Sequence, residues 1–61
     1  MNTPTARQRE VIKLYTENIK QSKTDQQRKA QQNILKGFVF GLCAGGYMHM
    51  SEAKDIIRRW C

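Results

Sequence analysis

Few residues in the chain could support catalysis: His49 is the only histidine, and Cys43 and Cys61 are the only cysteines. A cysteine nucleophile needs a histidine base within hydrogen-bond reach and a third group that orients the base. No local motif around either cysteine indicates such an arrangement, and Met48 and Met50 favour a His49 packed among apolar groups in a turn. We therefore expect no catalytic residues and no enzyme activity.

Metal and phosphate binding are not indicated either. The histidine and the cysteines are dispersed, whereas structural zinc sites use closely spaced pairs such as C-x-x-C or H-x-x-x-H. Gly45-Gly46 lacks the lysine and serine that follow in a phosphate-binding loop, and is typical of a helix end. The sequence predicts no metal, no cofactor and no small-molecule substrate.

The two thiols are expected to stay reduced. If the chain turns at residues 45–46 and a helix follows, Cys61 lies roughly 10 Å or more beyond the level of Cys43, too far for a disulfide. The polar segment Met1–Glu10 does not read as a signal peptide. We expect a cytoplasmic protein.

The segment 34–47 holds seven large apolar residues, both phenylalanines among them, and all four glycines. At helical spacing it contains one apolar row of Ile34, Phe38 and Leu42 and another of Leu35, Val39 and Leu42. A helix with so wide an apolar face needs more than one covering neighbour. The alternative, a buried strand over 38–43, would have no partner strand. The segment is shorter than the ~20 apolar residues that span a bilayer, so no membrane helix is expected.

Three of the glycines, Gly37, Gly41 and Gly45, recur every four residues and would line one strip of a helix. Each costs about 1 kcal/mol relative to alanine, which suggests that another backbone approaches the strip closely. A chain of 61 residues has a marginal core, so oligomerisation is the expected support. The residues expected at a self-association surface are Gly37, Phe40, Gly41, Tyr47 and Trp60. The alternative role of the aromatic residues is to fill the core of a single chain.

The first helix is expected over 4–21. Thr3 could cap its amide groups and Pro4 fits its first position. An apolar stripe at helical spacing follows, made of Val11, Ile12, Leu14, Tyr15 and Ile19. Local ion pairs are expected between Glu10 and Lys13 and between Glu17 and Lys20.

The second helix is expected over 25–44. It begins at a capping box from Thr24 to Gln27 and ends at the glycine pair. Its first two turns are polar, and only Ala30 there could face a core. This part is expected to project beyond the packed region.

The third helix is expected over 52–60, with Ser51 as its cap. An apolar face that packs on the second helix is formed by Ala53, Ile56, Ile57 and Trp60. The predicted fold class is all-α. The chain is expected to be one domain, residues 1–61, that forms a small three-helix bundle completed by dimerisation.

Charge is concentrated in the first part of the chain. The net charge is +6, and residues 1–36 carry eight lysines or arginines against three acids. A nucleic acid or another acidic partner could contact the basic residues Arg7, Arg9, Lys13, Lys20, Arg28, Lys29 and Lys36. The alternative is an ordinary solvated surface.

The second and third helices also loosely match a helix-turn-helix, the basis of an alternative function as a DNA-binding regulator. However, the connection is longer than usual, and Glu52 and Asp55 lie where base contacts belong.

The run from Leu35 to Leu42, the Gly45-Gly46-Tyr47-Met48 turn and the Ser51-Glu52-Ala53 start of an amphipathic end resemble small accessory proteins of temperate bacteriophages and prophages. The resemblance covers about half of the chain. It implies a helical, often dimeric protein without catalysis that alters host or phage processes by binding a larger host or phage protein. It implies no site residues. The leading hypothesis is thus a homodimeric accessory protein that acts through protein–protein contact.

Overall fold

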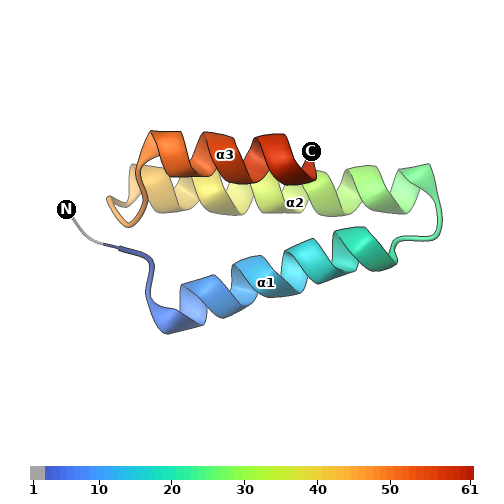
Figure 1. The fold of residues 1–61 in the computed structure, drawn as a ribbon, viewed down its shortest axis with the longest axis horizontal. Helices are drawn as coiled ribbons and strands as arrows, with labels where there is room; N and C mark the ends of the chain where they lie inside the picture. Colours follow the sequence, from blue (N-terminus) through green and yellow to red (C-terminus); the bar gives the residue numbers. More distant parts are fainter. Residues whose placement is uncertain (1–2) are drawn as a thin grey trace.

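The computed structural model describes residues 3–61, and these contain three helices and no strand (Figure 1). They are α1 (Ala6–Gln21), α2 (Asp25–Ala44) and α3 (Met50–Trp60). Helices α1 and α2 form an antiparallel hairpin, and α3 runs back along α2 (Figure 1). The prediction of a three-helix all-α fold is confirmed. Met1 and Asn2, which the predicted domain includes, lie outside the described residues.

Helix α1 begins two residues later than predicted, because Thr5 and not Thr3 is its cap. The N–H of Gln8 donates to Oγ1 of Thr5 at 3.1 Å, and the N–H of Thr5 donates to Oε1 of Gln8 at 2.8 Å. This reciprocal pair satisfies two amide groups, whereas Thr3 would have supplied a single acceptor. Pro4 precedes the cap, so it is not the first helical residue as predicted. Its side chain is buried.

The predicted bounds of α2 are confirmed. At its start, the N–H of Gln27 donates to Oγ1 of Thr24 at 3.1 Å. The reciprocal bond of the predicted capping box is shifted by one residue, since Oε1 of Gln27 accepts from the N–H of Lys23 at 3.1 Å. Asp25 lies in the first turn, where a carboxylate favours the positive end of the helix.

The end of α2 is closed by the glycine pair. Gly46 has a φ of 81°, a left-handed conformation that glycine adopts without steric cost. The N–H of Tyr47 donates to the carbonyl of Leu42 at 2.9 Å, and the N–H of Gly46 donates to that of Cys43 at 3.1 Å. These two bonds make a Schellman motif, so the predicted glycine stop is confirmed.

Helix α3 begins at Met50, two residues earlier than predicted. His49 is its cap residue but makes no side-chain capping bond, so the prediction of Ser51 as the cap is wrong. Met48, which precedes this cap, is only 4% exposed and belongs to the core. The carbonyl of His49 then accepts from the N–H of Ala53 at 3.0 Å and closes the first turn.

The core lies where the three helices meet. Its buried side chains are Ile19, Leu35, Val39, Leu42, Met48 and Ala53. Of the two predicted apolar rows, the row of Leu35, Val39 and Leu42 therefore forms the centre. In the other row Phe38 is half-buried, with its ring edge-on to Tyr15 of α1 at a centroid distance of 5.7 Å. The predicted apolar face of α3 packs on this core through Ala53, with its other members half-buried.

The polar first half of α2 is held by side-chain amides. Nδ2 of Asn18 donates to Oε1 of Gln31 at 3.4 Å, and Nε2 of Gln32 donates to the carbonyl of Trp60 at 3.0 Å. Ala30, the only residue of this part that the sequence suggested could face a core, is exposed. Gln31 and Gln32, the two residues after Ala30, make the contacts with α1 and α3 instead. They lie four and three residues before the buried Leu35, so they are on the same side of α2 as Leu35.

Candidate functional site

One side of α2 is covered by neither of the other helices. Phe38 and Gln31 contact α1, Gln32 contacts the end of α3, and the remaining side faces outward. Two large apolar side chains on it, Ile34 and Phe40, are each 45% exposed. We call this side, with its residues Ile34, Gly37, Phe40, Gly41 and Ala44, the outward face of α2.

Two of the glycines on the outward face have open space in front of them. A Cβ atom built on Gly37 or on Gly41 would meet no atom within 4 Å. No segment of the described chain therefore approaches the glycine strip there, and the predicted close backbone contact is not made within one molecule. A contact with a second molecule stays a prediction.

The third glycine of the strip is covered by Tyr47. A Cβ atom on Gly45 would lie 3.1 Å from Cδ2 and 3.3 Å from Cε2 of the Tyr47 ring. The ring thus lies against the last turn of α2 while 37% of the residue remains exposed. Tyr47 extends the exposed apolar surface from the outward face of α2 into the turn.

Trp60, the fifth residue predicted for self-association, lies elsewhere. It is half-buried against the core, and Nζ of Lys20 lies 5.3 Å from its ring centroid. The structure therefore places Gly37, Phe40, Gly41 and Tyr47 along one surface and gives Trp60 a role in packing the end of α3.

Sequence reasoning missed three exposed apolar residues. Leu14 is 57% exposed, Met50 48% and Ile34 45%, although Leu14 and Ile34 were assigned to core-facing rows. Leu14 could have been recognised, because its helical neighbours Glu10 and Asn18 are polar. Ile34 has no such signal, since Leu35 beside it is equally apolar.

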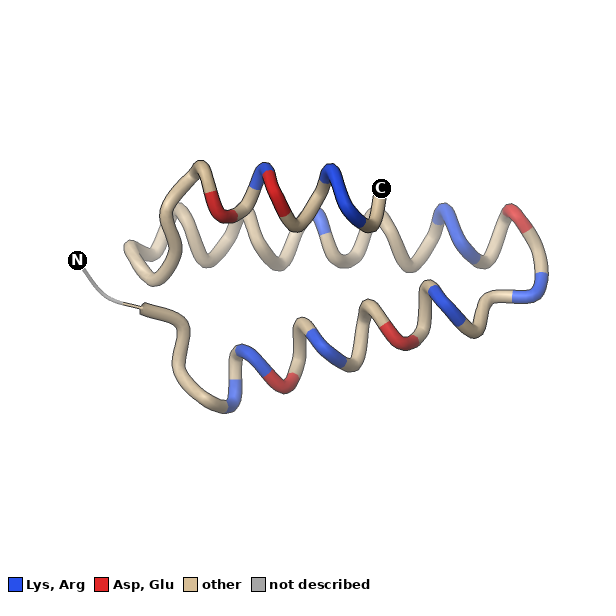
Figure 2. Tube along the Cα trace, viewed as in Figure 1, with Lys and Arg blue, Asp and Glu red and all other residues tan. Residues whose placement is uncertain are grey.

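The basic residues are exposed but do not form one cluster. All seven predicted contact residues are exposed, and Figure 2 shows basic and acidic residues alternating along α1, whereas α2 has an acid only at its start. Lys20 pairs with Glu17 and Arg28 with Asp25, each at 3.8 Å. The pair predicted between Glu10 and Lys13 is not among the ion pairs of the described chain.

The two thiols and the histidine lie in different surroundings. Cys43 and Cys61 are both free, as expected, and Sγ of Cys61 lies 3.8 Å from the carbonyl oxygen of Gln32. Partial burial raises the pKa of the Cys61 thiol, and the charge of Lys36 opposes this effect. His49 is exposed, so the prediction that it packs among apolar groups is wrong. Residues 3–61 contain no group of three or more potential ligands that could hold a metal ion.

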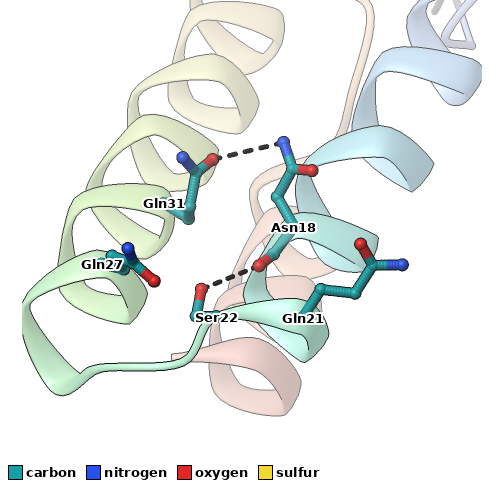
Figure 3. Close-up of a pocket in the computed structure, with 5 residues that line it drawn as sticks. All are labelled: Asn18, Gln21, Ser22, Gln27 and Gln31. Atoms are coloured by element: carbon teal, nitrogen blue, oxygen red, sulfur yellow. Dashed lines mark hydrogen bonds between the residues drawn. The ribbon is translucent and has the colours of Figure 1, made fainter.

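An open depression of about 410 Å³ lies between the end of α1 and the start of α2 (Figure 3). It is lined by Asn18, Gln21, Ser22, Gln27 and Gln31. These side chains are polar and uncharged. Some of their hydrogen-bonding groups already have partners within the chain, since Oγ of Ser22 donates to the carbonyl of Asn18 at 2.8 Å. The depression can offer hydrogen bonds from side-chain amides and from the Ser22 hydroxyl.

The path of α3 differs from that of a recognition helix. In a helix-turn-helix the two helices cross at roughly 90–120°, whereas α3 lies along α2 after a connection that spans residues 45–49 (Figure 1). The basic residues would have to contact DNA without that arrangement.

No helix of the described chain has the length and apolar character needed to cross a membrane. Comparison of the chain with known protein families, with curated proteins and with solved structures finds no match.

Proposed function

We propose that this protein is a small, non-enzymatic accessory protein that acts by binding a larger protein. In this proposal two copies associate through apolar surface of α2 and α3, and the charged α1 of each copy faces the partner. The resemblance to accessory proteins of temperate phages suggests a host or phage protein as that partner.

Exposed apolar side chains carry the proposal. Five large ones are between 37% and 57% exposed, namely Leu14, Ile34, Phe40, Tyr47 and Met50. Single exposed apolar residues are ordinary, but neighbouring ones mark contact surfaces. Ile34 and Phe40 share the outward face with the open Gly37 and Gly41, which leaves room for another molecule, and Tyr47 lies at the end of this face against Gly45.

The partner-binding role of α1 is supported by its exposed charges. Arg7, Arg9 and Lys13 are exposed, and acids of the same helix alternate with them (Figure 2). A surface with both signs of charge suits a protein partner with a matching pattern better than a uniformly negative polymer.

Light scattering and affinity capture test this function together. The protein should have the mass of a dimer at tens of micromolar, and a tagged form should retain a defined bacterial or phage protein. An Arg9→Glu, Lys13→Glu variant should keep the dimer mass and lose the captured protein. A monomer at this concentration, or capture that the charge reversal leaves unchanged, would contradict the proposal.

DNA binding is the second candidate, and the exposure of all seven basic residues supports it. Contacts with phosphates release counterions, so affinity should fall by about 10³-fold or more between 50 and 200 mM salt if six or more phosphates are contacted. Submicromolar binding of duplex DNA at physiological salt would favour this second function over the first.

A further inference from the structure

Residues 37–51, which form the end of α2, the turn after it and the start of α3, carry no charged side chain of lysine, arginine, aspartate or glutamate. Figure 2 shows this region without charge, while both other helices and the first half of α2 carry many charges. The exposed side chains of this uncharged region include Phe40, Tyr47 and Met50.

The distribution of charge indicates which molecule can cover this surface. An acidic partner would be attracted to the basic residues elsewhere, and nothing in the uncharged region would direct it there. A second copy of the chain has the same net charge of +6, so two copies repel one another wherever their basic residues meet. The uncharged region is where two like-charged copies can approach at least electrostatic cost.

The outward face of α2 is also complementary to itself. Phe40 and Ile34 protrude, each 45% exposed, while Gly37 and Gly41 between them leave open space. A two-fold contact needs protrusion and hollow on one surface, because the same patch is used by both copies. Glycines on one helix let the backbone of another approach closely, and the side chains beside them then pack across the contact.

We infer that the outward face of α2 is the contact between two copies of this chain, with the two α2 helices antiparallel and crossing at Gly37 and Gly41. This inference rests on the proposed function, which requires a dimer but does not specify its geometry. A parallel pair would bring both copies of Lys29, and both copies of Lys36, to the same end of the contact. The antiparallel pair directs the basic first halves of α2 to opposite ends and opposes the two helix dipoles.

The available area predicts a weak dimer. A stable interface takes about 800 Å² from each partner, a sizeable share of the 4507 Å² exposed by one chain. A helix of 20 residues is about 30 Å long and about 10 Å wide, so the α2 pair alone buries less than this. Tyr47 extends the contact at its end, and we expect a weak association that is populated at tens of micromolar.

The location of the contact is tested by sedimentation of matched variants. Phe40→Glu and Gly41→Leu should each give a monomer at about 50 μM with the helical circular dichroism of the wild type, because both positions are open in the single chain. Leu14→Glu places a charge on an equally exposed apolar residue of α1 and should leave the dimer intact. A dimer that survives the α2 variants but is lost in Leu14→Glu overturns the inference and leaves the proposed dimeric function standing. A wild-type monomer at this concentration overturns both.

The antiparallel geometry is tested by disulfide formation in a Cys43→Ser, Cys61→Ser background. Equal amounts of an Asn33→Cys protein and an Ala44→Cys protein are mixed and oxidised. Antiparallel helices that cross at Gly37 and Gly41 bring these positions together, so the mixed disulfide should exceed each symmetric product at least five-fold. Predominance of the symmetric disulfides would indicate a parallel pair and overturn the geometry.

Discussion

Nζ of Lys20 lies 5.3 Å from the centroid of the Trp60 ring, where the end of α1 meets the end of α3. The carbonyl of Trp60 accepts from Nε2 of Gln32 at 3.0 Å, so the same residue also contacts α2. One residue thus links the last turn of α3 to both helices of the hairpin. Trp60 therefore stabilises the fold of the single chain, whichever surface binds a second molecule.

Trp60→Ala should therefore destabilise the folded chain. Loss of the half-buried indole and of the Lys20 contact is expected to lower the free energy of unfolding by about 2 kcal/mol. Urea denaturation followed by circular dichroism measures this. Lys20→Gln removes the cation alone and should cost roughly 0.5 kcal/mol. Unchanged stability of Trp60→Ala together with loss of the dimer would instead place Trp60 in the self-association surface.

Thr5→Ala should weaken the start of α1. The variant loses the acceptor for the N–H of Gln8 and with it the reciprocal capping arrangement, at a cost of about 1 kcal/mol. Thermal melting is the appropriate measurement, with Thr3→Ala as the matched control. Thr3 precedes the cap, so its replacement should leave the melting temperature unchanged. The opposite ranking of the two variants would restore Thr3 as the cap.

Replacement of single glycines by alanine should have opposite effects at two positions. Gly46→Ala forces a side chain into a left-handed conformation with φ of 81° and should destabilise the chain by about 1 kcal/mol or more. Gly37→Ala places a methyl group in open space within a helix and should stabilise the single chain by up to about 1 kcal/mol. Both are measured by denaturation at a concentration low enough to keep the protein monomeric. Equal destabilisation by both would mean that Gly37 contacts something in the monomer.

Alkylation of Cys61 should be slower at neutral pH than that of a solvent-exposed model thiol. Partial burial raises the pKa of this thiol, and a raised pKa leaves less of the reactive thiolate. Lys36 favours the thiolate, so Lys36→Gln should raise the pKa further and slow the reaction again. The rate of reaction with iodoacetamide across a pH series, in a Cys43→Ser background, gives the pKa of Cys61 with Lys36 present and in Lys36→Gln. A faster reaction in Lys36→Gln would show that the lysine shields the thiol instead of stabilising its charge.

Some features of this protein depend on signals that lie within one turn of the chain. The bounds of α2 follow from Thr24 at its start and the glycine pair at its end, so they could be predicted without knowledge of any other helix. The same holds for the apolar face of α3, where regular spacing places Ala53 on the buried side. Local hydrogen bonds and helical periodicity are sufficient to determine such features.

At two other helix starts the residue type alone was misleading. Thr3 and Thr5 are both good caps, but only Thr5 has a glutamine three residues later, so the capping box of Thr5 and Gln8 could have been read from the sequence. Ser51 is a better cap than His49 by residue type, yet α3 begins at Met50, next to the turn that contains the buried Met48. The starts of α1 and α3 were therefore displaced by two residues while the helices themselves were correct.

The candidate contact surface was decided by tertiary structure. Ile34 and Leu35 are adjacent and equally apolar, yet Leu35 is fully buried and Ile34 is 45% exposed. Periodicity shows that α2 has a wide apolar face, but only the positions of α1 and α3 around it determine which part stays open. A helix can be covered from any direction by segments distant in the chain, and that direction is not encoded in the spacing of its own residues.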